Sequence, residues 1–407
     1  MILRIKNDEI NHILMKDWKI PLYKIYTDDE DLNMITKIIK RGSEWAIGPE
    51  IEELETLIKN YVGVDYCLTL NSGTSSLHAL LIAYEIRSNH EVIVPSFSFV
   101  STANSVLFVG AKPTFVDIEE TTFGLNSELI PSQINSNTKA IISMDYGGLS
   151  CKIFDILETA KKNNLILIDD AAEGLGSSIN GKKVGSIADS SIFSFCGNKV
   201  LTTGEGGAIV TNSKEIYEKV KLIRSHGRLD SINYFSNPSE SQYEGLGYNW
   251  RMSSIIAALG ISQLKKLDKI IKLRQENAKY ISTHLSKIPE IIIPSIPDGA
   301  EHIHQLFTIR LRDEKIRDDL HEFLIKKQIF SKVYFKPIHL TSFYRKKFNG
   351  KEGMLPITEN IAKTVLTLPL YPNMTQEEKK YLIDSINEIA PEHLELNFPH
   401  DLKYSRR

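Results

Sequence analysis

Residues 191–211 read SIFSFCGNKVLTTGEGGAIVT, which is an apolar strand, a loop rich in glycine and threonine, and a second apolar strand. One lysine, Lys199, lies in that loop between the two strands, where a solvated surface charge fits poorly. A lysine amine attacks carbonyl carbons only when it has lost its proton, a state that burial favours. The order Gly-Lys-Ser/Thr of a phosphate-binding P-loop is absent from this loop. The stretch therefore indicates a nucleophilic lysine beside a strand end.

An acidic pair ends the preceding apolar strand, in the run LILIDDAAE at residues 165–173. Asp169 and Asp170 come at its carboxyl end, and the small residues that follow permit close approach of a ligand. A carboxylate in this place suits a cation, and pyridoxal phosphate (PLP) needs such a partner for its pyridinium nitrogen. A Mg²⁺ ligand or a helix N-cap would use the same residue types. This segment alone leaves the three alternatives open.

Three further segments place polar or aromatic residues beside turns. The run NSGTSSL at residues 71–77 is typical of a phosphate site at a helix N-terminus, and equally of a plain N-cap. Phe99 ends PSFSF at residues 95–99, where its ring would stack on a flat ligand or pack in the core. LGYNWRM at residues 246–252 is either an aromatic turn or a polar hook for a phosphate or sugar.

Short β-rich runs alternate with helical stretches from about residue 65 to 210. This alternation predicts an α/β fold with a mainly parallel sheet, in which ligands bind at the carboxyl ends of the strands. The predicted strands are Tyr66–Leu70, Glu91–Val94, Lys112–Val116, Ala140–Met144, Leu165–Ile168, Ser191–Phe195 and Gly207–Thr211.

Helices are predicted before and after this alternating region. Amphipathic helices are expected at residues 29–41 and 50–61, and one long helix from Ser253 to about Leu285. A smaller α+β lobe should follow, with strands His304–Leu311 and Phe330–Phe335 and helices Asp313–Lys327 and Thr375–Ile389, the last with Thr375 and Glu378 as a capping box. The predicted division is a lead-in at 1–19, a large domain at 20–260, and the linking helix with a small C-terminal domain at 261–407.

Composition excludes several classes of protein. The chain has 407 residues, 42% hydrophobic, and a formal net charge of −2, so neither nucleic acid nor a membrane is expected as a partner. Its three cysteines lack paired or metal-type spacing, which indicates a reduced, cytoplasmic setting. The charged N-terminal residues do not form a secretory signal.

The five segments, in this order and spacing, resemble the DegT-type (DegT/DnrJ/StrS) PLP-dependent nucleotide-sugar aminotransferases. The resemblance extends from Ile20-Pro21-Leu22 to the run LPLYP at residues 368–372. It implies the aspartate aminotransferase-like architecture (PLP-dependent transferase fold type I), with a large seven-stranded domain and a smaller C-terminal α+β domain. It also implies a homodimer with shared active sites.

The resemblance also implies roles for individual residues. Lys199 matches the lysine that binds the cofactor covalently, and Asp170 the aspartate that faces the pyridine nitrogen. Phe99 matches the stacking aromatic residue, and Asn249 a phosphate ligand donated by the neighbouring subunit. The other expected cofactor contacts are Gly73, Thr74, Ser75, Glu173 and Ser194, and the expected substrate contacts are Trp45, Tyr248, Arg251 and His339; no metal site is expected.

One departure from the common family pattern concerns Glu173, where many members have Gln beside the cofactor's ring oxygen. A subset that includes perosamine synthases is similar, which indicates amination at C4 of a 4-keto-6-deoxy hexose. A carboxylate would repel an ionised phenol oxygen, so Glu173 is predicted to be protonated or to share a proton. Related sugar dehydratases have histidine in place of the lysine, and Lys199 argues against that chemistry.

The sequence therefore predicts transfer of an amino group, with glutamate as donor, to a nucleotide-linked 4-keto-6-deoxy sugar. There are three alternatives to this function. A regulatory or binding protein on the same fold is possible in principle, because fold does not fix function. A metal-dependent enzyme would need a His/Cys/carboxylate cluster at ligand spacing, and an iron–sulfur protein would need clustered cysteines; the sequence shows neither.

Overall fold

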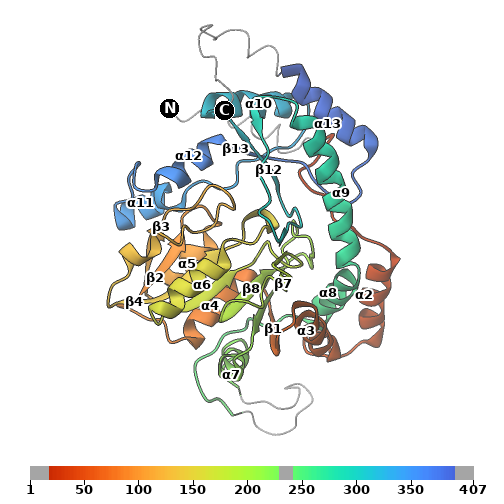
Figure 1. Cartoon of the computed structure of the whole chain (residues 1–407). Coiled ribbons are helices and arrows are strands. Elements are labelled where there is room, and N and C mark those ends of the chain that lie inside the picture. The colour runs from red at the N-terminus through yellow and green to blue at the C-terminus, as the bar shows by residue number, and fades with distance from the viewer. Residues whose placement is uncertain (1–17, 229–241, 390–407) are drawn as a thin grey trace.

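A seven-stranded sheet lies at the centre of the larger part of the chain (Figure 1). The computed structural model describes residues 18–228 and 242–389. Strands β8, β5, β4, β2 and β3 pair in parallel, and β9 runs antiparallel to both β1 and β8. The predicted mainly parallel sheet of seven strands is confirmed. In spatial order the strands are β1 (Tyr66–Leu70), β9 (Gly207–Thr211), β8 (Ser190–Ser194), β5 (Ile166–Asp170), β4 (Thr138–Met144), β2 (Glu91–Pro95) and β3 (Lys112–Val116).

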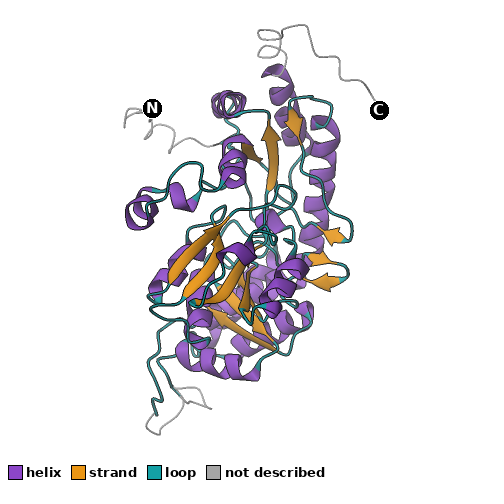
Figure 2. Ribbon diagram, turned by 60° about the vertical axis from the view of Figure 1, so that its left-hand side comes forward, coloured by secondary structure: helices purple, strands orange, loops and turns teal. Residues whose placement is uncertain are grey.

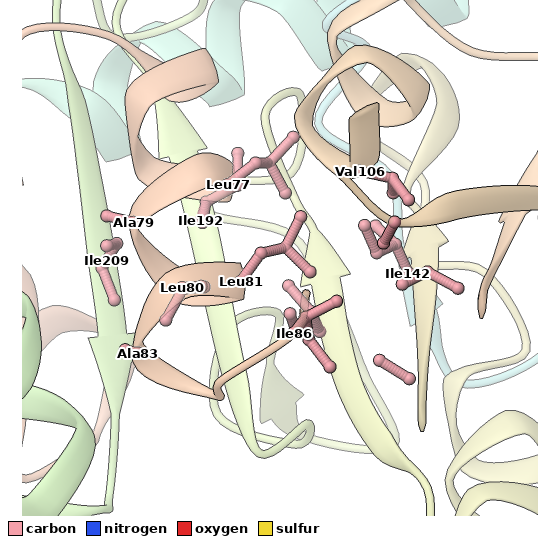
Figure 3. Close-up of a cluster of buried hydrophobic side chains, with 14 of the residues drawn as sticks. Leu77, Ala79, Leu80, Leu81, Ala83, Ile86, Val106, Ile142, Ile192 and Ile209 are labelled. Atoms are coloured by element: carbon pink, nitrogen blue, oxygen red, sulfur yellow. The ribbon is translucent and has the colours of Figure 1, made fainter. Parts of the chain in front are cut away.

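Helices cover both faces of this sheet, which explains why its strands are apolar at nearly every position. Side chains alternate between faces along a strand. Ile142 of β4 packs with Leu77 and Val106 on one face, whereas its neighbour Ile141 packs with Ile156 on the other. Figure 3 shows the first of these clusters under α4. The covering helices are α4 (Gly73–Ala83), α5 (Ser101–Phe108) and α7 (Lys214–Ile223) on one face, and α6 (Ile153–Lys162) on the other.

Two helices near the N-terminus confirm the predicted amphipathic segments. They are α2 (Asp29–Arg41) and α3 (Pro49–Val62), and both contact α8 (Ser254–Lys265). The predicted single helix from Ser253 to Leu285 is wrong at Lys266, where the backbone turns at φ −107° and ψ 6° before α9 (Leu267–Leu285). The buried ammonium of Lys266 donates to Asp28 and Asp31, and apolar periodicity alone does not reveal such an anchor.

A small sheet of order β10–β12–β13 forms the second lobe (Figure 2). The predicted strand at residues 330–335 is wrong: Lys332 makes a single bridge to Thr367, and β13 supplies the third strand instead. The capping box is confirmed, because Thr375 and Glu378 each accept the other's backbone N–H, at 3.1 and 2.8 Å. The elements are β10 (Ile291–Ile292), β12 (Phe307–Leu311), β13 (Val365–Leu368), α10 (Glu314–Lys326), α11 (Ser342–Phe348), α12 (Pro356–Thr364) and α13 (Gln376–Ile389).

A third, short sheet of order β11–β6–β7 consists of three two-residue strands. These are β6 (Ser178–Ile179), β7 (Lys182–Lys183) and β11 (Ala300–Glu301). The predicted domain boundary at residues 260 and 261 falls inside α8 and stays a prediction. Most of the predicted lead-in, residues 1–17, and the tail after residue 389 lie outside the described residues. Among the described helices, none combines the length and the apolar character that a membrane span requires.

Candidate active site

A cavity of about 340 Å³ opens at the carboxyl ends of the parallel strands. Its walls come from the segments after β1, β2, β5 and β8, and from residues 332–335 of the second lobe. This is the place where an open α/β sheet binds its ligands. Among the residues that line the cavity are seven predicted from the sequence: Gly73, Thr74, Phe99, Asp170, Glu173, Ser194 and Lys199.

The predicted nucleophile, Lys199, is paired with Glu173. Its Nζ lies 3.0 Å from Oε1 of Glu173, and both side chains are largely buried. The other carboxylate oxygen accepts the backbone N–H of Gly147 at 2.8 Å. Gln305 fixes the lysine loop from the second lobe, because its Oε1 accepts the N–H of Val200 at 2.6 Å. The amine is therefore held at one defined place in the cavity wall.

The pairing gives Glu173 a role that the sequence did not predict. Both of its oxygens accept hydrogen bonds from nitrogen donors, as an ionised carboxylate does. Glu173 was predicted to be protonated, or to share a proton, when the cofactor is in place. That stays a prediction. In this arrangement the charged partner of the acid is the ammonium of Lys199.

Asp170, the last residue of β5, presents a buried carboxylate to the same cavity. Its Oδ2 accepts the hydroxyl of Thr102 at 2.7 Å, and its Oδ1 accepts the N–H of Ala172 at 3.3 Å. Burial raises the pKa of the Asp170 carboxyl above its ordinary value, while the bond from Thr102 opposes that shift. A cation against this carboxylate would offset its desolvation, as a protonated ring nitrogen would.

The opposite end of the cavity is built for an anion. Helix α4 begins at Gly73, directly after β1, and its N-cap Ser72 accepts the N–H of Ser75 at 3.0 Å. A Cβ on Gly73 would lie 3.1 Å from the Cβ of Ser194, so the helix start and the end of β8 are in close contact. Free N–H groups and the positive end of the helix dipole suit a phosphate.

Ser75 is buried beneath this helix start and serves the cap. Its hydroxyl donates to Oδ1 of Asn71 at 2.7 Å and to the carbonyl of Ser72 at 2.8 Å. Ser75 is not among the residues that line the cavity. The predicted cofactor contact through Ser75 therefore has no support in the geometry of its side chain.

The residues of this cavity fit PLP. A lysine amine, a buried carboxylate and a helix N-terminus meet on one cavity, which matches the aldehyde, ring nitrogen and phosphate of that cofactor. Phe99 lines the cavity with 59% of its side chain exposed, which leaves a ring face free to stack on a flat ligand. Lys199, Asp170 and the turn at Gly73 would hold the three ends of the cofactor.

Four predicted contacts, one at residue 45 and three within residues 248–251, lie away from the cavity. Asn249 is exposed and bridges to Ser225, so its predicted contact with a neighbouring subunit stays a prediction. Tyr248 stacks on Trp250, with ring centroids 3.9 Å apart. Arg251 reaches Ser225 Oγ at 3.4 Å, and Trp45 donates its indole N–H to the carbonyl of Ile38 at 3.1 Å. None of the four lines the cavity of its own chain.

His339 is also outside the cavity, in the core beneath it. Only 2% of the residue is exposed, and its ring nitrogens contact Ser96 Oγ at 2.7 Å and Glu359 Oε1 at 3.2 Å. Burial lowers the pKa of the imidazole below its ordinary value. Because the ring is hydrogen-bonded on both sides, it positions the segment around it. The predicted contact of His339 with the sugar has no support in this geometry.

Several residues in the cavity wall or directly behind it could not be found from the sequence. Thr102 follows the PSFSF segment by one helical turn, and only the structure shows its hydroxyl on Asp170. Tyr334 and Phe335 reach the cavity from the segment that was predicted to be a strand. Burial raises the pKa of Tyr334 to about 12, and the negative charge of Glu173 adds to the shift.

A second acidic pair lies buried next to this site. Ligand atoms of Asp145, Cys151 and Asp169 fall within 4.8 Å of one another, a grouping of carboxylates and thiol that spacing along the chain had not revealed. Ser143 donates to Asp169 at 2.7 Å, and the N–H of Cys151 donates to Asp145 at 2.8 Å. Burial and the charge of Asp169 raise the pKa of Asp145 well above its ordinary value. Two buried carboxyls this close disfavour the ionised form of both, and we expect the pair to hold a proton.

The sequence and structure of the chain match known sugar aminotransferases over nearly their whole length. The DegT/DnrJ/EryC1/StrS aminotransferase family matches residues 26–387. A GDP-perosamine synthase of Escherichia coli O157:H7 is 32% identical over 371 residues, which is 91% of this chain and 98% of the relative. The family match and the likeness to a perosamine synthase confirm the resemblance inferred from the motifs.

Solved structures agree with this assignment. PseC of Helicobacter pylori, an aminotransferase involved in pseudoaminic acid biosynthesis, superposes with a TM-score of 0.85 at 30% identity, covering 92% of this chain and 99% of its own. The putative sugar aminotransferase Spr1654 of Streptococcus pneumoniae in its PLP form gives 0.86 at 25% identity, covering 92% and 99%. These likenesses confirm the predicted fold and cofactor. The chain belongs to the DegT/DnrJ/EryC1/StrS aminotransferase family.

Proposed function

We propose that this chain transfers the amino group of glutamate to C4 of a nucleotide-linked 4-keto-6-deoxy hexose, giving an amino sugar for polysaccharide or secondary-metabolite biosynthesis. The observation that carries the proposal is that Lys199 and Asp170 line one cavity together with the anion-binding turn at Gly73. Amino transfer requires these three elements at once. The choice of sugar is supported by Glu173 and by the likeness to a GDP-perosamine synthase.

When bound, PLP supplies an electron sink for the carbon that loses or gains the amino group. Asp170 holds the proton of the ring nitrogen, which keeps the ring electron-poor. Thr102 fixes that carboxylate through its bond to Oδ2. Gly73, Thr74 and Ser194 would bind the phosphate, and Phe99 would stack on the ring.

Lys199 moves the proton that the reaction requires. When not bonded to the cofactor, its amine would take a proton from the donor's Cα and return it to the aldehyde-derived carbon of the cofactor, on the other side of the shared nitrogen. Glu173 lies 3.0 Å from that nitrogen and keeps it within the cavity during both halves of the reaction. The same groups act in the reverse order when the keto sugar replaces the amino acid.

The active protein is proposed to be a homodimer with shared sites. Asn249 lies on the surface of its own subunit, as a residue that completes a neighbouring cavity must. Mixing two inactive variants tests this arrangement. Lys199→Ala and Asn249→Ala each disable a different part of a shared site, so hybrid dimers should regain activity in one of their two sites. Activity that never exceeds that of the separate variants would contradict shared sites.

The cytoplasm is the proposed location, which the three free cysteines Cys67, Cys151 and Cys196 are consistent with. The substrate is tested by incubating the holoenzyme with glutamate and a panel of UDP-, GDP- and dTDP-linked 4-keto-6-deoxy sugars. We expect one member of the panel to be converted to its 4-amino sugar with equimolar 2-oxoglutarate. Amination at another ring carbon, or a different amino donor, would replace that part of the proposal.

A further inference from the structure

We infer that Lys332 is an anion-binding residue of the substrate site, which receives a carboxylate of the amino donor or the diphosphate of the sugar nucleotide. The inference rests on the proposed function, because that function makes both substrates anions. It concerns a residue of the second lobe that no sequence motif singled out. It follows from where the backbone of Lys332 is fixed and from the charges around the cavity.

The backbone holds Lys332 firmly at the cavity. Its N–H donates to the carbonyl of Thr367 at 3.0 Å, and its own carbonyl accepts the N–H of Thr367 at 2.8 Å. This two-way bridge to β13 fixes the Cα at the edge of the small sheet. From there the chain runs straight into the cavity wall, where Tyr334 and Phe335 also contribute side chains.

The ammonium group lies near an aromatic ring that is itself fixed. Nζ of Lys332 lies 4.6 Å from the centroid of the Tyr334 ring, within the range of a cation–π contact. The carbonyl of Tyr334 accepts the hydroxyl of Tyr146 at 2.7 Å. The ring therefore limits where the flexible lysine side chain can place its charge, which lowers the entropy that an ion pair with a ligand costs.

Charge balance shows why the cavity needs this cation. The described lining carries three carboxylates, Asp170, Glu173 and Glu205, and two lysines, Lys199 and Lys332, a formal balance of −1. Lys199 is paired with Glu173. Lys332 forms no ion pair with the described residues that line the cavity, so its charge is available to an incoming anion. Without Lys332 the formal balance of this lining would be −2, so its charge lowers the repulsion that glutamate or a sugar nucleotide meets there.

An exposed lysine is more often a solvated surface group than a ligand contact. The chain offers a matched example in Lys336, four residues further on, which is also exposed and does not line the cavity. A solvated lysine can be neutralised without effect on substrate binding. The two residues therefore make a test pair, with Lys336→Gln as the control for Lys332→Gln and Lys332→Arg as the variant that keeps the charge.

The experiment measures the two half-reactions of the PLP-loaded protein separately. The first follows loss of the cofactor's visible absorbance with glutamate and, in parallel, with alanine, which lacks the second carboxylate. The second follows its return when the aminated cofactor meets the keto-sugar nucleotide. Calorimetric binding of glutarate and of nucleoside diphosphates without turnover gives a readout that does not depend on catalysis.

We expect Lys332→Gln to raise the KM for one anionic substrate about tenfold, with kcat changed much less, because one exposed charge-assisted contact is lost. Lys332→Arg should restore most of the loss. A higher KM for glutamate but not for alanine identifies the side-chain carboxylate as the group that Lys332 binds. A higher KM for both amino acids identifies the α-carboxylate. A higher KM for the keto sugar identifies the diphosphate. The calorimetric affinities should fall in parallel.

KM values and affinities for all anions within twofold of the Lys336→Gln control would overturn the inference. That result is distinct from failure of the proposed function, in which the wild-type protein itself aminates no keto-sugar nucleotide. In that case the calorimetric comparison of Lys332→Gln with the control still decides whether the cavity binds anions through Lys332.

Discussion

Nζ of Lys199 lies 3.0 Å from Oε1 of Glu173, and the second oxygen of the same carboxylate accepts the N–H of Gly147 at 2.8 Å. The acid thus connects the lysine loop after β8 with the turn after β4. It holds the nucleophile in place before any cofactor binds.

The effect of Glu173 can be separated into charge and hydrogen bonding. Glu173→Gln keeps an acceptor for one of the two N–H donors, and we expect it to cost below about 1 kcal/mol of unfolding free energy. Glu173→Ala leaves the buried ammonium and the Gly147 N–H unpaired and should cost about 1–3 kcal/mol. Thermal unfolding of the cofactor-free proteins measures both. Equal losses for the two variants would contradict this division, because they would assign the whole loss to the negative charge and none to the hydrogen bond that the amide keeps.

Asp170 should control the rate rather than the presence of the cofactor. Asp170→Asn keeps the volume but removes the negative charge that holds the ring proton, and we expect kcat to fall about 100-fold or more. Thr102→Val, which removes only the hydroxyl on Asp170, should reduce kcat less, by about tenfold. Stopped-flow rates with glutamate at saturating PLP check both. Wild-type rates in a fully loaded Asp170→Asn protein would contradict the assignment.

The buried pair Asp145 and Asp169 predicts a pH dependence of stability. Because burial raises the pKa of Asp145 above its ordinary value of 3.8, the folded protein holds this proton more tightly than the unfolded chain. Its contribution is therefore fully present below the ordinary pKa and is lost as the pH rises through the raised value. Asp145→Asn removes the penalty at neutral pH while keeping an acceptor for Cys151.

The measurement is the Tm of Asp145→Asn and wild type between about pH 5 and about pH 8. The Tm of the variant relative to wild type should increase with pH across this range, by the equivalent of about 1 kcal/mol or more. Asp169→Asn should behave alike, because it also leaves one carboxyl in the pair. A difference that stays constant or decreases with pH would mean that the two acids do not share a proton.

The turn that we propose as the phosphate site depends on backbone contact with β9. A Cβ on Gly207 would lie 2.5 Å from the carbonyl carbon of Ser72 and 2.7 Å from the N of Gly73. Gly207→Ala should therefore weaken PLP binding about tenfold and destabilise the fold by about 1–3 kcal/mol. Gly197→Ala in the lysine loop is the control, since its Cβ would meet its nearest neighbour only at 3.9 Å. Fluorescence titration with PLP should separate the two variants.

The sheet was predictable because its strands are buried on both faces and end on distinctive residues. Asp170, Lys199 and Gly73 all stand at the carboxyl ends of strands, so the parallel topology alone brings them together. The break at Lys266 was not predictable, since the apolar pattern continues through it and the carboxylates of Asp28 and Asp31 that anchor it lie more than 200 positions away.

One segment of the second lobe, residues 330–335, was not predictable for a related reason. Residues 330–335 have strand-like composition, yet Lys332 pairs with Thr367 through one bridge and the segment then leaves the sheet for the cavity. Once such a segment has left its sheet, contacts with the other lobe decide which of its side chains face a ligand. The same applies to His339, whose partners Ser96 and Glu359 come from two distant segments.

Reduction with borohydride tests the central claim, that Lys199 carries the cofactor, most directly. Borohydride converts the carbon–nitrogen double bond between the PLP aldehyde and an amine into a stable single bond, and peptide mass spectrometry then locates the label. We predict loss of the visible absorbance and a phosphopyridoxyl group on Lys199 alone, absent in Lys199→Ala. A label on another lysine, or the same absorbance and label in Lys199→Ala, would contradict the account.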